Sequence, residues 1–175
     1  TNKRGWTSTT SYDAKGNLLS HTDPLGQTTS STYEPTFNQV ASSTDALLRT
    51  TSFTYDAKGN HTQTTDAAGG ITTFTYDTAG NLLTRTDPLG ATTTFTYDTH
   101  GNLLTVTDTL GNVTSHTYDL GGRRTSTTDA RGNKTTFAYD ATNNLTAITD
   151  PIGNITSFTY DANGNLTQKT EPGSI

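Results

Sequence analysis

The sequence predicts an all-β fold of tandem antiparallel hairpins, about 21 residues each, and three observations lead to it. Tyrosine recurs with one period, turn residues recur at fixed offsets, and the composition favours strands. Only 29% of the 175 residues are hydrophobic, and about a quarter are threonine. Low hydrophobicity alone would indicate disorder, but Thr, Tyr, Phe, Val and Ile suit a half-buried pleated surface. We therefore expect strands and no helix.

The tyrosine period defines the repeat. Successive tyrosines are 21 residues apart, except for a spacing of 22 between Tyr33 and Tyr55. An acidic residue follows each of them, which is Asp in every repeat but the second. The eight tyrosines of this structural repeat are Tyr12, Tyr33, Tyr55, Tyr76, Tyr97, Tyr118, Tyr139 and Tyr160.

Two turn signals divide each repeat into two strands. Asp77–Gly80 follows a tyrosine and Asp87–Gly90 comes ten residues later; in both, Asp stands first and Gly fourth. Asp caps its own turn and Gly accepts a positive φ, so both segments predict a type I turn closed by a glycine bulge. Asn143 can replace Gly in such a turn, whereas Phe37 cannot and predicts a deformed loop. The expected turn glycines after the tyrosines are Gly16, Gly59, Gly80, Gly101, Gly122 and Gly164.

The segments between the turns have strand length and a two-residue alternation. This alternation places Phe95 and Tyr97 on one face and Thr94 and Thr96 on the other. Phe recurs two residues before Tyr and Leu recurs six residues after it in most repeats, which predicts ladders of apolar side chains. We expect the Phe95 and Tyr97 face to be covered, by the sheet's own curvature or a neighbouring copy, and the threonine face to meet solvent.

The repeat runs through the whole sequence as one array. Residues 1–175 hold about eight repeats in what we expect to be a continuous curved or spiralling sheet, with an irregular second unit around 33–54. Lys3-Arg4-Gly5 and Glu171-Pro172-Gly173 stand at one phase of the repeat, without atypical capping units. We therefore expect the array to be an excerpt of a longer one.

Composition excludes several classes of partner. The net charge is −5 and the eleven basic residues are scattered, so we expect no nucleic-acid binding. No apolar run of about 18 residues is present, so we expect no membrane insertion. The lack of cysteine excludes a disulfide scaffold.

No catalytic, cofactor-binding or metal site is expected. The Asp residues stand at turn positions, one to a turn, whereas a calcium loop needs several carboxylates. The histidines His21, His61, His100 and His116 occupy four different phases, so stacking does not gather them. Asn-x-Thr sequons give candidate glycosylation sites if the protein is secreted, although Asn is also expected beside such turns. These sites are Asn60, Asn112, Asn133, Asn144, Asn154 and Asn165.

The repeat resembles the YD-repeat, or Rhs, family over essentially the whole chain. The match is carried by Tyr-Asp-Thr-Ala-Gly-Asn-Leu at 76–82, followed by Asp-Pro-Leu-Gly at 87–90. The resemblance implies a β-sheet strip that winds into a hollow shell. In bacterial toxin systems of this family the shell encloses a cytotoxic segment, and in cell-surface relatives it supports adhesion and recognition.

One activity of the family is not implied for this chain. Members that release a cargo carry paired Asp-Pro-x-Gly-Leu motifs that act as an aspartyl self-protease. Here Gly26, Gly90 and Gly153 are followed by Gln, Ala and Asn. We therefore expect the Asp-Pro pairs to act as turns only.

The sequence thus favours a structural role. We expect a non-catalytic module of a large secreted or cell-surface protein, forming part of a shell wall or a self-associating fibre or tube. Its partners would be further copies of the repeat and, in a full-length protein, an encapsulated polypeptide. The alternative is an adhesion module that binds carbohydrate or protein, for which Trp6 and Phe37 are the candidate aromatic residues.

Overall fold

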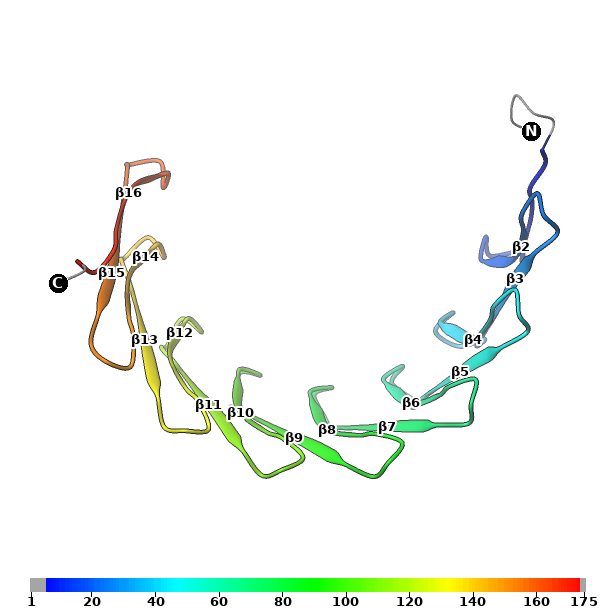
Figure 1. The fold of residues 1–175 in the computed structure, drawn as a ribbon, viewed down its shortest axis with the longest axis horizontal. Helices are drawn as coiled ribbons and strands as arrows, with labels where there is room; N and C mark the ends of the chain where they lie inside the picture. Colours follow the sequence, from blue (N-terminus) through cyan, green and yellow to red (C-terminus); the bar gives the residue numbers. More distant parts are fainter. Residues whose placement is uncertain (1–5, 174–175) are drawn as a thin grey trace. The chain divides into compact units, whose positions relative to one another are not determined.

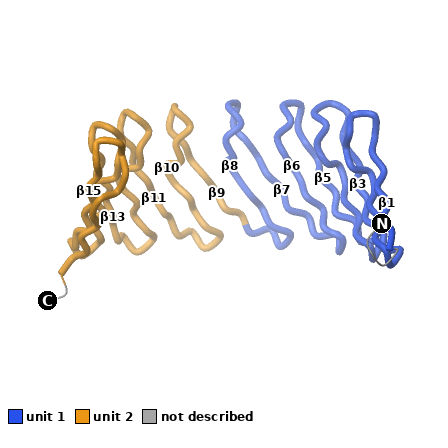
Figure 2. The backbone as a smooth tube through the Cα atoms, turned by 90° about the horizontal axis from the view of Figure 1, so that it is seen from above, with its two compact units in different colours: residues 1–91 blue, residues 92–175 orange. Residues whose placement is uncertain are grey.

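The computed structural model describes residues 6–173, which form sixteen β-strands and no helix. Within those residues, then, no helix could cross a membrane. Lys3, Arg4 and Gly5, which supported the expected continuation of the array, lie outside the described residues. The chain divides into two compact units, residues 1–91 and 92–175 (Figure 2).

The first unit is a single layer of eight antiparallel strands in chain order (Figure 1). Each strand pairs with the next through a short turn, so every hairpin shares its strands with its neighbours. The strands are β1 (Thr9–Tyr12), β2 (Leu18–Thr22), β3 (Thr28–Tyr33), β4 (Val40–Thr44), β5 (Thr50–Tyr55), β6 (His61–Thr65), β7 (Ile71–Tyr76) and β8 (Leu82–Thr86).

The second unit repeats this arrangement. Its strands also pair antiparallel in chain order, and they form a single layer (Figure 1). They are β9 (Thr92–Tyr97), β10 (Leu103–Thr107), β11 (Val113–Tyr118), β12 (Arg124–Thr128), β13 (Lys134–Tyr139), β14 (Leu145–Thr149), β15 (Ile155–Tyr160) and β16 (Leu166–Thr170). The all-β hairpin fold expected from the repeat is therefore confirmed.

The strand boundaries follow from the sequence. Every odd-numbered strand ends at the tyrosine of its repeat, and every even-numbered strand ends at a threonine. The next residue is acidic and, after each of β1 to β15, it starts a turn, because its side chain accepts backbone bonds that a strand would otherwise use. We call the turns that follow the tyrosines the tyrosine turns, and those that follow the threonines the threonine turns.

Both kinds of turn share one backbone geometry. In the tyrosine turn 77–81, the Gly80 amide donates to the Asp77 carbonyl at 3.2 Å, and the Asp77 amide donates to the Asn81 carbonyl at 3.0 Å. The φ of Gly80 is 92°. In the threonine turn 87–91, the corresponding distances are 2.9 and 3.0 Å, and the φ of Gly90 is 84°. Both turns therefore close with a backbone bond from the fourth residue to the first and place a left-handed glycine at the fourth position; the type I assignment itself stays a prediction.

The irregular second repeat has a physical explanation. Its extra residue lies in the tyrosine turn, which runs from Glu34 to Gln39, and the Glu34 amide donates to the Gln39 carbonyl at 2.9 Å. Asn38, rather than Phe37, takes the left-handed conformation, with a φ of 61°. In the following threonine turn the left-handed residue is Leu48, at φ 62°. Nothing in its side-chain chemistry favours that conformation.

A bulge that the sequence analysis did not foresee distorts each tyrosine hairpin. In β7 and β8, Thr75 pairs with Thr84 but Tyr76 pairs with Leu82, so Leu83 is an extra residue. The same register shift occurs beside every tyrosine from Tyr12 to Tyr160 for which pairing is described. Bulges bend a strand and increase its twist, and this one recurs once in each repeat.

The fold has no hydrophobic core within residues 6–173. No hydrophobic side chain there is fully buried, and Ser126 is the one buried polar residue, at 3% exposure. Phe95 and Tyr97 are half-buried, whereas Thr94 and Thr96 are exposed, so the two faces differ in the expected direction. No second layer of strands covers the aromatic side in either unit, and local hydrogen bonding must hold the repeats together.

Candidate functional site: the seam between repeats

In addition to the strand ladders, side-chain contacts join neighbouring repeats near the tyrosine turns, and we call these contacts the seam. Each turn first organises its own Asp. One oxygen of Asp77 accepts the Ala79 and Asn81 amides at 2.8 and 2.9 Å, and its other oxygen accepts the Asn81 side-chain amide at 2.8 Å. Both oxygens are thus occupied within a five-residue loop.

These bonds set the acidity of the turn carboxyls. The side-chain amide of Asn81, followed by its backbone amide, lowers the pKa of Asp77. Asn102 acts in the same way on Asp98. Because hydrogen bonds to the charged form stabilise it, these carboxylates are charged structural acceptors and poor candidates for acid catalysis.

Tyrosine hydroxyls form the second layer of the seam. The pairing of β6 with β7 extends from Thr65 opposite Ile71 to Gln63 opposite Thr73. Beyond it, the Tyr76 hydroxyl donates to the His61 carbonyl at 2.8 Å. The bond therefore joins the two strands where that ladder has ended.

This bond has one spacing wherever it is found. The acceptor always lies 15 residues before the tyrosine and is the residue paired with the preceding repeat's tyrosine, beside the bulge. Burial, followed by the charge of Asp56, raises the pKa of Tyr76. The other bonds of this kind are Tyr33 to Leu18 (3.1 Å), Tyr55 to Val40 (2.7 Å), Tyr139 to Arg124 (3.1 Å) and Tyr160 to Leu145 (2.8 Å).

The tyrosine turns also stack on one another. A Cβ atom at Gly80 would lie 3.5 Å from the Asn60 side-chain oxygen of the preceding repeat. The Lys58 ammonium donates to the Thr78 carbonyl at 2.6 Å, a separation of twenty residues. In the lengthened loop, the Phe37 ring lies 3.1 Å from the position of a Cβ at Gly59. By contrast, nothing lies within 4 Å of such a Cβ at Gly90, in a threonine turn.

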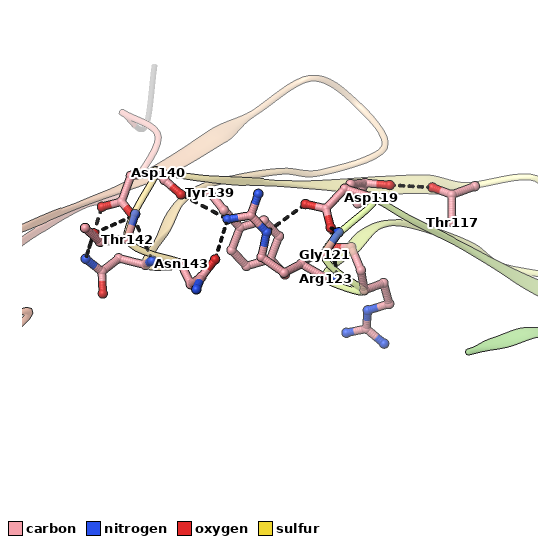
Figure 3. Close-up of polar contacts among 11 residues, drawn as sticks. Thr117, Asp119, Gly121, Arg123, Tyr139, Asp140, Thr142 and Asn143 are labelled. Carbon is pink, nitrogen blue, oxygen red and sulfur yellow. Dashed lines mark hydrogen bonds and ion pairs between the residues drawn. The ribbon is translucent and has the colours of Figure 1, made fainter. Parts of the chain in front are cut away.

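Arg123 makes several seam contacts in the second unit (Figure 3). It stands where most repeats have Asn, and its Nε donates to Asp119 Oδ2 at 2.7 Å. Its Nη1 reaches the next repeat, donating to the Asp140 carbonyl and to Asn143 Oδ1, both at 2.9 Å. The guanidinium also lies 5.0 Å from the centre of the Tyr139 ring. A planar group with several donors can bridge two turns in this way.

The histidines lie in separate parts of the sheet. His61 lies among aromatic rings, with the centre of its ring 4.8 Å from that of Phe74. In the second unit, His116 Nδ1 lies 3.0 Å from the Thr127 hydroxyl, and burial, followed by the charge of Arg124, lowers its pKa. Across residues 6–173, no cluster of three or more His, Cys, Asp or Glu side chains could hold a metal ion.

The six sequon asparagines all lie at the ends of turns. Each donates its side-chain nitrogen to the Asp of its own turn, at distances of 2.8 to 3.0 Å. Glycosylation attaches to that nitrogen, so a sugar would have to coexist with the bond. Modification at these positions stays a prediction.

Trp6 and Phe37, the two aromatic residues considered for binding, lie at opposite ends of the strands. Trp6 precedes β1, at the threonine-turn end of that strand, and is 50% exposed. Phe37 lies in a tyrosine turn, at the opposite end of the strands, and covers Gly59. They do not form one aromatic surface.

Comparison with known proteins places the chain among repeat proteins. The RHS repeat family model matches residues 12–47, 35–73, 55–92, 76–110, 97–134 and 139–174. No curated protein sequence matches the chain.

Solved structures share the fold at low sequence identity. A TcdB2–TccC3 crystal structure without the hypervariable C-terminal region matches 94% of this chain, with a TM-score of 0.72 and 19% identity. A Tc holotoxin pore of Photorhabdus luminescens matches 97% of it, with a TM-score of 0.69 and 17% identity. This chain spans only 10% and 12% of those two chains. Since the family matches cover most of the residues, and five of the six begin at a tyrosine of the repeat, the chain belongs to the RHS repeat family.

Proposed function

We propose that this chain is a structural wall module of a large secreted or cell-surface protein and catalyses no reaction. The observation that carries the proposal is the use of its polar groups. The Asp side chains that could do chemistry are occupied within their own turns, as at Asp77. Five tyrosine hydroxyls donate hydrogen bonds that join neighbouring repeats, as at Tyr76. A sheet organised in this way supplies surface and mechanical continuity.

The similar structures support a wall role in particular. Both are Tc toxin components or assemblies, and this chain aligns with a tenth or so of each of their chains. In the proposal, the repeats form part of a shell around a polypeptide cargo, and their partners are further copies of the same repeat. A sheet of many strands tends to curl or close, which suits an enclosing wall.

The adhesion alternative has weaker support. It needs an exposed aromatic surface to stack against a sugar or a partner protein. Trp6 and Phe37 lie at opposite ends of the hairpins, and the Phe37 ring already packs on the next turn. The wall role therefore accounts for more of the observed contacts.

Electron microscopy of the purified chain tests the proposal. Negative-stain images should show thin strips, or larger bodies built from such strips, because a single layer of hairpins has no core around which to become compact. Compact globular particles would contradict the wall role. A carbohydrate that binds in solution and is lost in the Trp6→Ala variant would favour the adhesion role instead.

A further inference from the structure

The threonine turns carry a row of exposed aliphatic side chains. Their third positions are occupied by Leu25 (74% exposed), Leu47 (72%), Leu89 (94%), Leu110 (86%) and Ile152 (85%). Ala68 and Arg131 fill the same position in the other two complete turns. Side chains this exposed contribute little to the packing of their own sheet.

Turn chemistry does not explain these residues. The tyrosine turns have the same backbone bonds, yet their third positions are polar or small: Lys15, Lys58, Ala79, His100, Gly121, Thr142 and Asn163. Polar residues are the usual occupants of such turns. At the third turn position, aliphatic residues are thus confined to the threonine-turn edge of the sheet and are not required by the turn itself. Leu120 is an exposed leucine of a tyrosine turn, but it stands at the second position.

Further apolar surface lies next to the same edge. The odd-numbered strands β7, β11 and β15 each begin with a β-branched aliphatic residue directly after a threonine turn. Ile71, Val113 and Ile155 are 45%, 43% and 54% exposed. Exposed apolar surface concentrated in this way marks an interaction site.

The spaces between threonine turns are open. Apart from the adjacent residues of the chain, no atom of residues 6–173 lies within 4 Å of a Cβ built at Gly26, Gly69 or Gly90. A groove between the turns 45–49 and 66–70 of the first unit is lined by Ser43, Asp45, Arg49, Thr51 and Asp66–Ala68. Between the turns 108–112 and 129–133 of the second unit, an equivalent groove is lined by Val106, Asp108 and Arg131 among others. Tips and gaps thus alternate along the edge with the repeat.

We infer that the threonine-turn edge is a homotypic interaction surface that binds the threonine-turn edge of a second copy. The edges of two copies have the same repeat spacing. The aliphatic side chains at the third turn positions of one copy can therefore lie between the threonine turns of the other at successive repeats. A partner with another period could match only one or two of them. Arg131, the basic exception in the row, would meet the acidic turns of the partner.

The negative charge of the threonine-turn edge argues against binding to a lipid surface, which is the other large apolar partner to consider. Every threonine turn from 23 to 150 begins with an Asp carboxylate, and basic residues within these turns are restricted to Arg49 and Arg131. Arg49 is already paired with Asp45. An edge with this excess of negative charge is repelled by anionic headgroups. Two copies of the edge also repel each other, but salt screens this repulsion between exposed charges, so the aliphatic contacts must outweigh it and association should strengthen as the salt concentration rises. The inference rests on the proposed wall role and assigns the edge through which strips associate laterally.

Sedimentation equilibrium over a concentration series tests the inference on the whole chain. The wild type should associate, and the triple variant Leu25→Ser, Leu47→Ser, Leu89→Ser should raise the dissociation constant about a hundredfold. The matched control is Leu120→Ser, because Leu120 is fully exposed on a tyrosine turn. It should associate like the wild type.

Two single-cysteine variants test the same surface by crosslinking, which reports contact between copies even if a substitution changes stability. Each variant has one thiol, because the chain has no native cysteine. Under mild oxidation, Leu89→Cys should form a disulfide-linked dimer, whereas Leu120→Cys should remain mostly monomeric. A wild type that stays monomeric, or equal crosslinking by the two variants, would overturn the homotypic edge. Strip-like particles in the electron microscope would leave the wall role standing in that case, and compact particles would overturn the wall role itself.

Discussion

Removal of a single tyrosine hydroxyl tests how the repeats are joined. The Tyr76→Phe substitution keeps the ring on the aromatic face and deletes the bond to the His61 carbonyl, which is 2.8 Å long. A hydrogen bond of this kind contributes about 0.5–1.5 kcal/mol net. The carbonyl left behind is only half-buried, so water can partly replace the donor. We expect a cost of about 1 kcal/mol, which corresponds to a roughly fivefold shift in the opening equilibrium.

Hydrogen exchange measured by mass spectrometry is the appropriate assay, because repeat arrays open locally between neighbouring units. Peptides that cover β6 and β7 should exchange about five times faster in the variant, if exchange follows local opening. The matched control is Tyr12→Phe, since Tyr12 is 59% exposed and its hydroxyl donates no seam bond among the described residues. Equal effects of the two substitutions would refute the structural role of the hydroxyl.

Three other perturbations probe the turns and the titrating groups. Leu48 has a left-handed backbone, with a φ of 62°, and the Leu48→Gly substitution removes that strain. The free energy of unfolding, measured by urea denaturation, should rise by up to about 1 kcal/mol. The control substitution Leu47→Gly should not raise it. His116→Phe should reduce the loss of stability as pH falls below 6.5, because burial lowers the folded pKa of this histidine below its unfolded value; the exposed turn variant His100→Gln is the control for acid denaturation. Burial raises the pKa of Tyr55. The contribution of its protonated hydroxyl to the free energy of unfolding should therefore be present below pH 10 and be lost as the pH rises through the folded pKa. Tyrosinate absorbance, followed together with circular dichroism, measures both events.

The sequence was sufficient to predict the fold because the same local signals recur in each repeat. Tyrosine spacing, Asp at the first turn position and Gly at the fourth each have a local physical cause, so Asp77–Gly80 and Asp87–Gly90 could be assigned without tertiary information. The difference between the two faces also followed from alternation, as Phe95 and Thr96 illustrate.

The seam could not be predicted in the same way. The bulge at Leu83 leaves no signature, since the residue is as apolar as the Leu82 beside it. The bond from Tyr76 to the His61 carbonyl depends on where one strand ladder ends and therefore on three-dimensional geometry. The Arg123 contact arises because a long side chain replaces a short one at a stacked turn. Spacing alone shows that such residues are neighbours and leaves the atoms that meet undetermined.

The central claim is that this chain, poor in hydrophobic residues, folds as an ordered single-layer sheet held by its turns and seam. Residue-resolved hydrogen exchange of the purified 175-residue chain tests it most directly, because low hydrophobicity would otherwise indicate disorder. The account predicts protected amides in β2 to β15, with the slowest exchange at residues paired on both sides. Exchange at the rate of an unfolded chain throughout these strands would contradict it.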